Sequence, residues 1–459
     1  MRRPTLIIIL LVAMVTLVLL SLCPWHEWTG GRLKNFNLLS DLLPAQVAEI
    51  VSPDENIDPE LKKLLEEPDD TISDPDSIVP DAPVIKEIPD DFKAPLIDGN
   101  VAIEDYSIDD KGLERLASTL SNATRRKVRI AMIGDSYIEG DILAQDIRAG
   151  LQTRYGGHGV GYMAAFSAFP GFRSSVNQTA SGWEGHEIAK MKDDPLRTIY
   201  GSYFTSSPGA NARFRKSVKP ARLESWGRSS VMFLAKNAGS LTVASPDFEK
   251  KVILFEASPD IQFVSIDSVS GDVRFTTDVP DLNVLGFWLE DISGISLDGI
   301  SLRGNSGLSH RQLNATTTAQ MRRFIDYDLI ILEFGLNVLS ATQSNYSKYA
   351  DTMVEVVNNL KTLYPNAQIL IFGVGDRGQK SGTEVISMPT INALVKAQRD
   401  VARRTESLFW DMREAMGGVG AAVDWHSRKL LNSDYVHLNH RGGKELAEIF
   451  LNSLDASIK

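Results

Sequence analysis

The sequence predicts an α/β protein with three parts: a three-layer α/β/α domain on a parallel sheet, an antiparallel β-sandwich inserted into that domain, and an N-terminal transmembrane helix. Three observations support this prediction. Short apolar segments alternate with amphipathic helical segments on both sides of a central region, which is typical of a parallel sheet covered on both faces. The central region has short β-type segments without helical periodicity. The first residues form an uncharged apolar run of membrane-spanning length.

The predicted membrane anchor covers residues 1–29. An uncharged run at 4–24 follows two arginines, and about 20 apolar residues at ~1.5 Å each span a bilayer. The arginines would stay in the cytoplasm and place the rest of the chain outside it. One alternative is a cleaved signal peptide, although SLCPW contains no small-x-small cleavage site. Another is a lipid on Cys23, although Leu22 is larger than the residue that such processing usually requires.

Residues 30–104 are predicted to form a stalk or linker. From residue 51 on, this segment is rich in Asp, Glu and Pro, so it cannot bury enough apolar surface to offset its chain entropy. The same composition fits a disordered tail.

The chain carries a net charge of −11, which argues against general nucleic-acid binding because phosphate recognition needs a basic face. A single cysteine excludes an internal disulfide.

The first part of the α/β domain is predicted at 105–175. A short amphipathic helix at 112–124 precedes the apolar segment KVRIAMI (127–133), which is typical of a buried strand. GDILAQDIRAGLQTRYG (140–156) then returns to helical spacing. We expect the glycine- and aromatic-rich segment 154–172 to be a long loop at the same edge of the sheet.

Residues 176–299 form the predicted insert, a candidate carbohydrate-binding domain. Short β-rich segments alternate there with Gly, Pro, Asp and Ser, which suggests an antiparallel sandwich. Two tandem α/β domains are the alternative, but the single α/β unit before the insert could not fold alone. The α/β domain then resumes at 300–459. Its predicted strands are at 327–337, 367–374 and 407–412, and its predicted helices are at 345–366, 388–405 and 442–457.

Ser136 follows the strand 127–133 in the turn GDS and is the candidate nucleophile. Sites in a parallel α/β sheet form at the carboxyl ends of strands, and the next helix can direct its N-terminal amides at an anion near this serine. A serine hydroxyl is a weak nucleophile at neutral pH, so it needs a base within hydrogen-bond reach and a partner that orients that base.

The polar segment NSDYVHLNHRGG, between the last strand and the last helix, contains Asp434 and His437. Their spacing lets a carboxylate in a turn reach Nδ1 of the imidazole and leave Nε2 free. An isolated D-x-x-H pattern is usually structural, but here it returns to the edge that carries Ser136. Donors for an oxyanion are the amide of Ser136, the side chain of Asn337 at the carboxyl end of the segment 327–337, and a glycine amide in SLRGNSGLS.

Four segments, in this order along the chain, resemble the four conserved blocks of the SGNH (GDSL-like) hydrolase family: IGDSYIEGD, RGNSGLS, FGLNV and DYVHLN. The resemblance covers about residues 108–175 and 300–457. The family often has Asp after the Asn of its third block, where this chain has Val338. The resemblance implies Ser136 as nucleophile, His437 as general base, Asp434 as its orienting partner, and an oxyanion hole of Ser136, Asn337 and Gly307, which we prefer to Gly304.

Together with the anchor, stalk and insert, the resemblance points to extracytoplasmic enzymes of bacterial envelopes. It implies a serine esterase acting on O-acetyl groups of peptidoglycan or exopolysaccharide, on the periplasmic side of the inner membrane. An O-acetyltransferase served by a membrane-bound O-acyltransferase is one alternative, and a non-catalytic glycan-binding or assembly protein is another. No cofactor is implied, and no metal-ligand spacing is present. Candidate substrate contacts are Asp135, Tyr162, Asp376 and Arg377.

Overall fold

The computed structural model describes residues 92–459, apart from 168–169, 191 and 218–221. The predicted anchor at 1–29 and the predicted stalk as far as residue 91 lie outside the described residues. Within the described ranges, no helix is long and apolar enough to cross a membrane.

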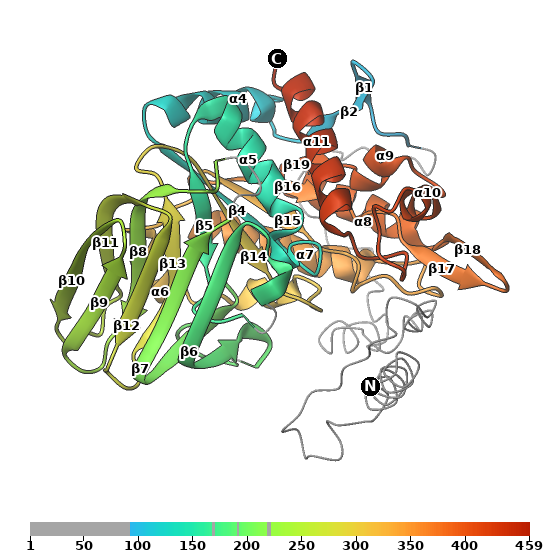
Figure 1. Cartoon of the computed structure of the whole chain (residues 1–459). Helices are drawn as coiled ribbons and strands as arrows, with labels where there is room; N and C mark the ends of the chain where they lie inside the picture. Colours follow the sequence, from blue (N-terminus) through green and yellow to red (C-terminus); the bar gives the residue numbers. More distant parts are fainter. Residues whose placement is uncertain (1–91, 168–169, 191, 218–221) are drawn as a thin grey trace, which may run out of the picture. The chain divides into compact units, whose positions relative to one another are not determined.

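A six-stranded sheet forms the centre of the α/β part of the chain (Figure 1). Five strands are parallel, and an antiparallel strand, β3, closes one edge. The sheet order β14-β4-β15-β16-β19-β3 places the first parallel strand, β4, between the second and the third. The strands are β3 (Ile103–Asp105), β4 (Lys127–Gly134), β14 (Gly294–Ser301), β15 (Leu329–Glu333), β16 (Gln368–Phe372) and β19 (Leu408–Trp410).

Helices cover both faces of this sheet, and its central strands are therefore buried and apolar. Helix α5 (Ala144–Tyr155) packs against α11 (His440–Ser457), and the two run side by side in Figure 1. Helices α7 (Ser347–Leu363) and α8 (Ile391–Arg404) form a second packed pair. Because β14 and β15 lie on opposite sides of β4, right-handed crossovers place the helices after β4 and after β15 on opposite faces.

Smaller elements connect these layers. The described helices also include α4 (Gly112–Ser121), α6 (Ala315–Arg322), α9 (Met412–Met416) and α10 (Ala421–Ser427). Two short hairpins are formed by β1 (Leu96–Ile97) with β2 (Asn100–Val101) and by β17 (Gly378–Ser381) with β18 (Glu384–Ser387).

The chain between β4 and β14 forms a nine-stranded antiparallel sheet with a hydrophobic core of its own (Figure 1). Trp226, Phe214 and Phe275 are among the fully buried side chains of that core. Strand β13 pairs with β5, β7 and β8, so the sheet branches there. The strands are β5 (Gly159–Met163), β6 (Val176–Glu187), β7 (Ser202–Lys216), β8 (Trp226–Leu234), β9 (Gly239–Ser245), β10 (Phe248–Phe255), β11 (Gln262–Ser270), β12 (Asp272–Thr277) and β13 (Asn283–Glu290).

Three segments differ from the sequence-based expectation. The segment 154–172, expected to be a long loop, contains β5, in which Gly161 passes so close to β14 that a Cβ there would lie 2.4 Å from the Leu297 carbonyl oxygen. Strand β14 belongs to the parallel sheet, so the chain re-enters that sheet at residue 294 rather than after the predicted insert boundary at 299. Strands β1 to β3 lie within the range assigned to the stalk, and β3 pairs with β19.

Buried polar contacts join the two sheets. Arg129 of β4 forms an ion pair of 2.5 Å with Glu290 of β13, and Lys127 also contacts this carboxylate. Trp288 of β13 donates its indole N–H to Asp298 of β14 at 2.9 Å. Burial would raise the pKa of Glu290, but Arg129 and Lys127 outweigh it and lower that pKa to about 2. The antiparallel sheet is therefore fixed to the edge of the parallel one.

Candidate active site

The turn after β4 places Ser136 at the carboxyl edge of the sheet. Gly134 ends the strand, and a Cβ at this position would come within 2.5 Å of both the backbone carbonyl and the carboxylate of Glu333 on β15. Only glycine therefore lets the two strands approach this closely before the chain turns. Ser136 is half-buried. It follows β4, whose two neighbouring strands are reached by connections that run in opposite directions along the sheet. Binding sites in such folds usually form at this switch point.

Asp434 and His437 form a hydrogen-bonded pair in the loop before α11. The imidazole Nδ1 lies 2.8 Å from Asp434 Oδ2, and the other carboxylate oxygen accepts the amides of Val436 and His437 at 2.9 and 3.0 Å. Burial would raise the pKa of Asp434, but these hydrogen bonds outweigh it and hold the pKa below its usual value. The carboxylate therefore stays ionised, and it fixes both the loop and the imidazole.

This loop is attached directly to the turn that carries Ser136. Tyr137 donates its hydroxyl to the carbonyl of Val436 at 2.9 Å, a buried bond between residues 299 positions apart. Burial raises the pKa of Asp135 to about 6, and the Tyr137 amide and the positive charge of His437 both oppose that rise. The Tyr137–Val436 bond therefore holds the loop of His437 against the turn that carries Ser136. The structure brings the three predicted catalytic residues to one edge of the sheet.

The predicted oxyanion donors come from two loops that contact each other. Asn337 follows β15, is half-buried, and places its side-chain amide 3.4 Å from the backbone carbonyl of Asn305. The amide of Gly307 donates to Asn305 Oδ1 at 2.7 Å, so it already has a partner within the protein. Gly304, the alternative glycine, is exposed. The loop after β14 therefore lies beside Asn337.

Comparisons with known proteins bear on the fold. No protein-family model matches the chain, and no curated protein matches it. A solved peptidoglycan O-acetylesterase superposes with a TM-score of 0.63 at 20% identity, over 78% of this chain and 99% of that one. The chain has an SGNH hydrolase-like fold.

Other solved structures superpose less well. A family two carbohydrate esterase from Cellvibrio japonicus has a TM-score of 0.25 at 14% identity, over 61% of this chain and 98% of that one. A salicylyl-acyltransferase from a tetracycline biosynthetic pathway has a TM-score of 0.27 at 13% identity, over 62% and 99%. These superpositions are too loose to carry an argument about this chain.

Two predicted substrate contacts do not face solvent in this SGNH-like fold. Asp376 is fully buried; its oxygens accept hydrogen bonds from Arg413, Ser387 and the amide of Ala422. It therefore supports the β17–α10 region rather than a ligand. Asp135 is also fully buried.

The other two predicted substrate contacts differ from each other. Arg377 donates to the carbonyl of Leu336 at 2.9 Å, next to Asn337. Tyr162 is buried and stacks on Tyr200 with the ring centroids 4.6 Å apart, but it lines a pocket of about 570 Å³. Arg377 is therefore close to the site, whereas Tyr162 faces a neighbouring cavity.

Two residues of the site were not singled out from the sequence. Tyr137 anchors the His437 loop, and nothing in the sequence marked it except its position after Ser136. Glu333 is fully buried under the nucleophile turn, and neither carboxylate oxygen has a hydrogen-bond partner among the described residues. Burial and the neighbouring Asp135 raise the pKa of Glu333 well above its ordinary value. A carboxylate at the end of the apolar strand segment LIILE was the signal for it. The described residues contain no group of His, Cys, Asp or Glu arranged to hold a metal ion.

Proposed function

We propose that this chain is a serine esterase that removes O-acetyl groups from a bacterial envelope glycan, either peptidoglycan or exopolysaccharide. The observation that carries the proposal is the attachment of the Asp434–His437 pair to the Ser136 turn through Tyr137 and Val436. This arrangement supplies a nucleophile, a base and an orienting carboxylate at one strand edge. The likeness in fold to a peptidoglycan O-acetylesterase supports an acetylated glycan as the substrate class.

The proposed mechanism has two displacements. His437 Nε2 takes the proton of Ser136 Oγ while that oxygen attacks the acetyl carbonyl carbon. The tetrahedral intermediate collapses when the bond to the sugar oxygen breaks and His437 returns the proton to that oxygen. Water, deprotonated by His437, then attacks the acetyl-serine; the bond to Ser136 Oγ breaks, His437 returns the proton to that oxygen, and acetate leaves. Asp434 holds the imidazole in the correct orientation and stabilises its positive charge.

The oxyanion of both intermediates needs donors that point at it. We assign the backbone amide of Ser136 and the side-chain amide of Asn337 to this role. A third donor would come from the loop after β14. For Gly307 to be that donor, its amide has to release Asn305 Oδ1 and donate its hydrogen bond to the oxyanion instead. The N-terminal anchor, the location at the membrane and a partner O-acyltransferase stay predictions from the sequence.

The test is acetate release by the full-length chain from an aryl acetate and from O-acetylated peptidoglycan. Wild type should release acetate from both, and Ser136→Ala and His437→Ala should each lose at least about a thousandfold in kcat. Ser433→Ala, an exposed serine in the same loop as His437, is the matched control and should keep full activity. Equal activity of Ser136→Ala and wild type would refute the assignment.

The same experiment separates hydrolysis from transfer, because both pass through an acetyl-serine. A sugar acceptor is added to the reaction with the aryl acetate. Acetate release that does not depend on the acceptor supports the esterase, whereas acetylated acceptor formed in place of acetate would identify a transferase.

A further inference from the structure

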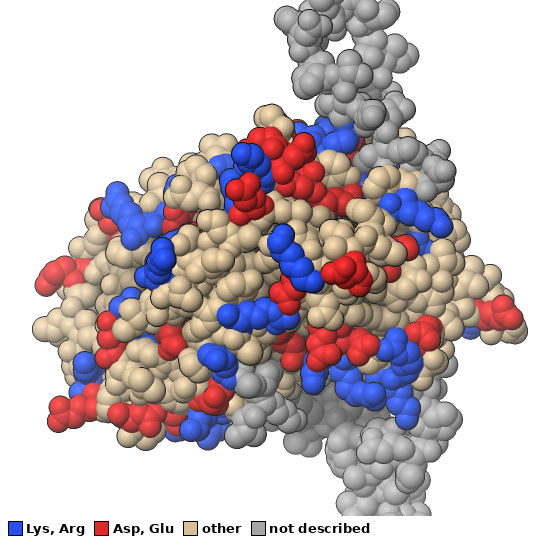
Figure 2. Space-filling view, turned by 90° about the horizontal axis from the view of Figure 1, so that it is seen from above, with Lys and Arg blue, Asp and Glu red and all other residues tan. Residues whose placement is uncertain are grey.

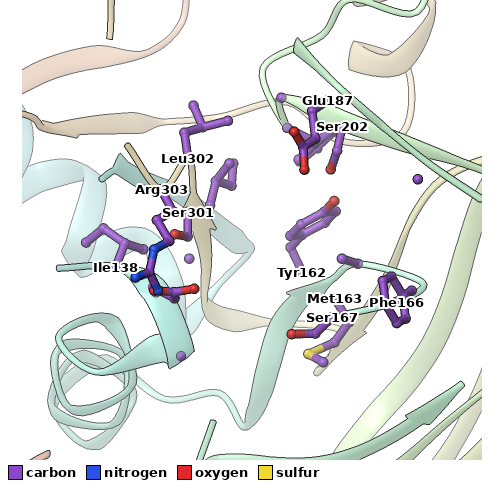
Figure 3. Close-up of a pocket in the computed structure, with 18 of the residues that line it drawn as sticks. Ile138, Tyr162, Met163, Phe166, Ser167, Glu187, Ser202, Ser301, Leu302 and Arg303 are labelled. Atoms are coloured by element: carbon purple, nitrogen blue, oxygen red, sulfur yellow. The ribbon is translucent and has the colours of Figure 1, made fainter. Parts of the chain in front are cut away.

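A pocket of about 570 Å³ lies between the antiparallel sheet and the carboxyl end of β14, and we call it the inter-sheet pocket. In Figure 3, Ser301, Leu302 and Arg303 form one side of it, and Tyr162, Phe166 and Ser202 form the other. Its volume is in the range of sites that bind small molecules. Neither sheet alone makes it, so the inserted strands complete a cavity on the α/β part of the chain.

Three of the residues that line the inter-sheet pocket also lie next to the candidate active site. Ile138 lines it two residues after Ser136. Ser301 lines it and donates its hydroxyl to the backbone carbonyl of Asp135 at 3.1 Å. Asn305 also lines it, and its backbone carbonyl accepts the side-chain amide of Asn337. A polymer with one unit at Ser136 therefore has a neighbouring unit within reach of this pocket.

The charged side chains around the inter-sheet pocket compensate one another. Each arginine among its described lining residues pairs with a carboxylate that also lines it: Arg173 with Asp141 at 3.0 Å and Arg303 with Glu139 at 2.7 Å. Lys190 pairs with Glu187 at 3.2 Å at the rim. This pairing weakens the attraction of these cations for an anionic ligand. In the face shown in Figure 2, basic and acidic side chains are likewise interspersed rather than gathered by sign.

The remaining lining combines aromatic surface with uncharged polar groups. Phe166 leaves 46% of its surface exposed, although large apolar side chains are normally covered. Gln178 and Ser202 add a side-chain amide and a hydroxyl to the lining. A ligand with both hydroxyl groups and an apolar face fits such a lining, and a pyranose ring has both.

We propose that the inter-sheet pocket binds an uncharged saccharide unit of the glycan chain, next to the unit whose acetyl group reaches Ser136. This inference rests on the proposed function, because it assigns a second subsite to the same substrate. The antiparallel sheet then contributes to substrate selection through Phe166 and its neighbours, while the α/β part carries the chemistry.

The first test is kinetic, on the full-length chain. Phe166→Ala should raise KM for an O-acetylated tetramer of N-acetylglucosamine by about tenfold, the loss expected for one aromatic contact. Its kcat/KM for an aryl acetate, which is too small to fill the pocket, should stay within about twofold. Phe324→Ala removes a comparably exposed phenylalanine that does not line the pocket, and it should change neither value. Equal losses on both substrates, or an unchanged KM for the tetramer, would overturn the proposal.

A binding experiment separates this proposal from the proposed function. Ser136→Ala is titrated with the unacetylated tetramer of N-acetylglucosamine and, in parallel, with a tetragalacturonate of similar length. The neutral tetramer should bind, the anionic one should bind at least tenfold more weakly, and Phe166→Ala in the same background should weaken the neutral tetramer about tenfold. If wild type lacks esterase activity but this binding pattern is observed, the result supports the saccharide site in the pocket and refutes the proposed esterase function. Absent binding, or equal binding of the uronate, contradicts the pocket assignment.

Discussion

Three carboxyl groups lie around Ser136, and their environments give them different roles. Asp434 accepts three hydrogen bonds, and they hold its pKa low enough to keep it ionised. Asp135 and Glu333 are buried next to each other, and burial raises both pKa values. The ionised group orients the imidazole, and of the two buried groups Asp135 accepts the Tyr137 amide within the turn at 3.2 Å.

Replacing Asp434 with Asn should lower kcat for an aryl acetate by about a thousandfold, because an amide neither fixes the imidazole tautomer nor stabilises its charge. The fold should be kept, as far-ultraviolet circular dichroism can verify. Asp424→Asn, at an exposed position of α10, is the control and should behave like wild type. A loss below about tenfold would contradict the role of Asp434.

Replacing Glu333 with Gln should change how stability depends on pH. The raised pKa of Glu333 means that its neutral form stabilises the folded state at low pH, and that this contribution is lost as the pH rises through the folded pKa. Wild type should therefore lose more unfolding free energy than Glu333→Gln between about pH 5 and pH 8, measured by urea unfolding. The exposed Glu384→Gln should follow wild type, and parallel curves for all three proteins would refute this account.

At the scale of elements, one loop brings the distant parts of the site together. The segment from Asp434 to His437 precedes α11, whose first turn is capped by the side chain of Asn439. On its other side, the carbonyl of Tyr435 accepts the amide of Gly378 at 2.9 Å. The loop is therefore held by a helix cap, by a hairpin and by the nucleophile turn at once.

Tyr137→Phe removes the bond to Val436 and leaves a carbonyl without its partner. We expect a loss of about 1–2 kcal/mol in unfolding free energy and a fall of about tenfold or more in kcat, because the imidazole is no longer held at its working position. Tyr155→Phe, at a half-buried tyrosine of α5, controls for the lost hydroxyl and should be near neutral in activity. Full activity of Tyr137→Phe would show that the loop is positioned by its other contacts.

The sequence predicted the elements that have a strong local pattern. It did not predict those whose conformation or sheet membership depends on tertiary contacts. The buried strands β4, β15 and β16 and the long helices α7, α8 and α11 were predicted from their apolar periodicity. Strand β5 was missed because its glycines indicated a loop. In the structure, these glycines allow β5 to pass close to β14. Strand β14 was assigned to the insert because its short β pattern resembles the strands before it.

At the scale of the whole molecule, the two sheets behave as one body in the described residues. Both sheets belong to one compact unit, and the buried pair of Arg129 and Glu290 joins them. The trio of Ser136, Asp434 and His437 was predicted from motifs because each lies in a recognisable local segment. The partner of the Gly307 amide and the inter-sheet pocket depend on contacts between distant segments, so the sequence did not reveal them.

Glu290→Gln should destabilise the protein by about 3 kcal/mol at pH 7, because it leaves Arg129 and Lys127 buried without a counter-charge. The pKa of Glu290 is lowered to about 2, so its contribution is present above the unfolded pKa and is lost as the pH falls through about 2. The difference from wild type in urea unfolding should therefore shrink between about pH 5 and pH 2. The exposed Glu249→Gln should stay close to wild type throughout. A difference that does not change with pH would contradict the ion-pair account.

The most direct test of the central claim is to trap the acyl-enzyme. Full-length wild type is mixed with an aryl acetate, quenched in acid within the first turnovers, and digested for peptide mass spectrometry. We predict an acetyl group on Ser136 in wild type, more of it in Asp434→Asn if deacylation slows, and none on the corresponding peptide of Ser136→Ala. Acetate release at the wild-type rate by Ser136→Ala, with no acetylated peptide in wild type, would contradict the proposed mechanism.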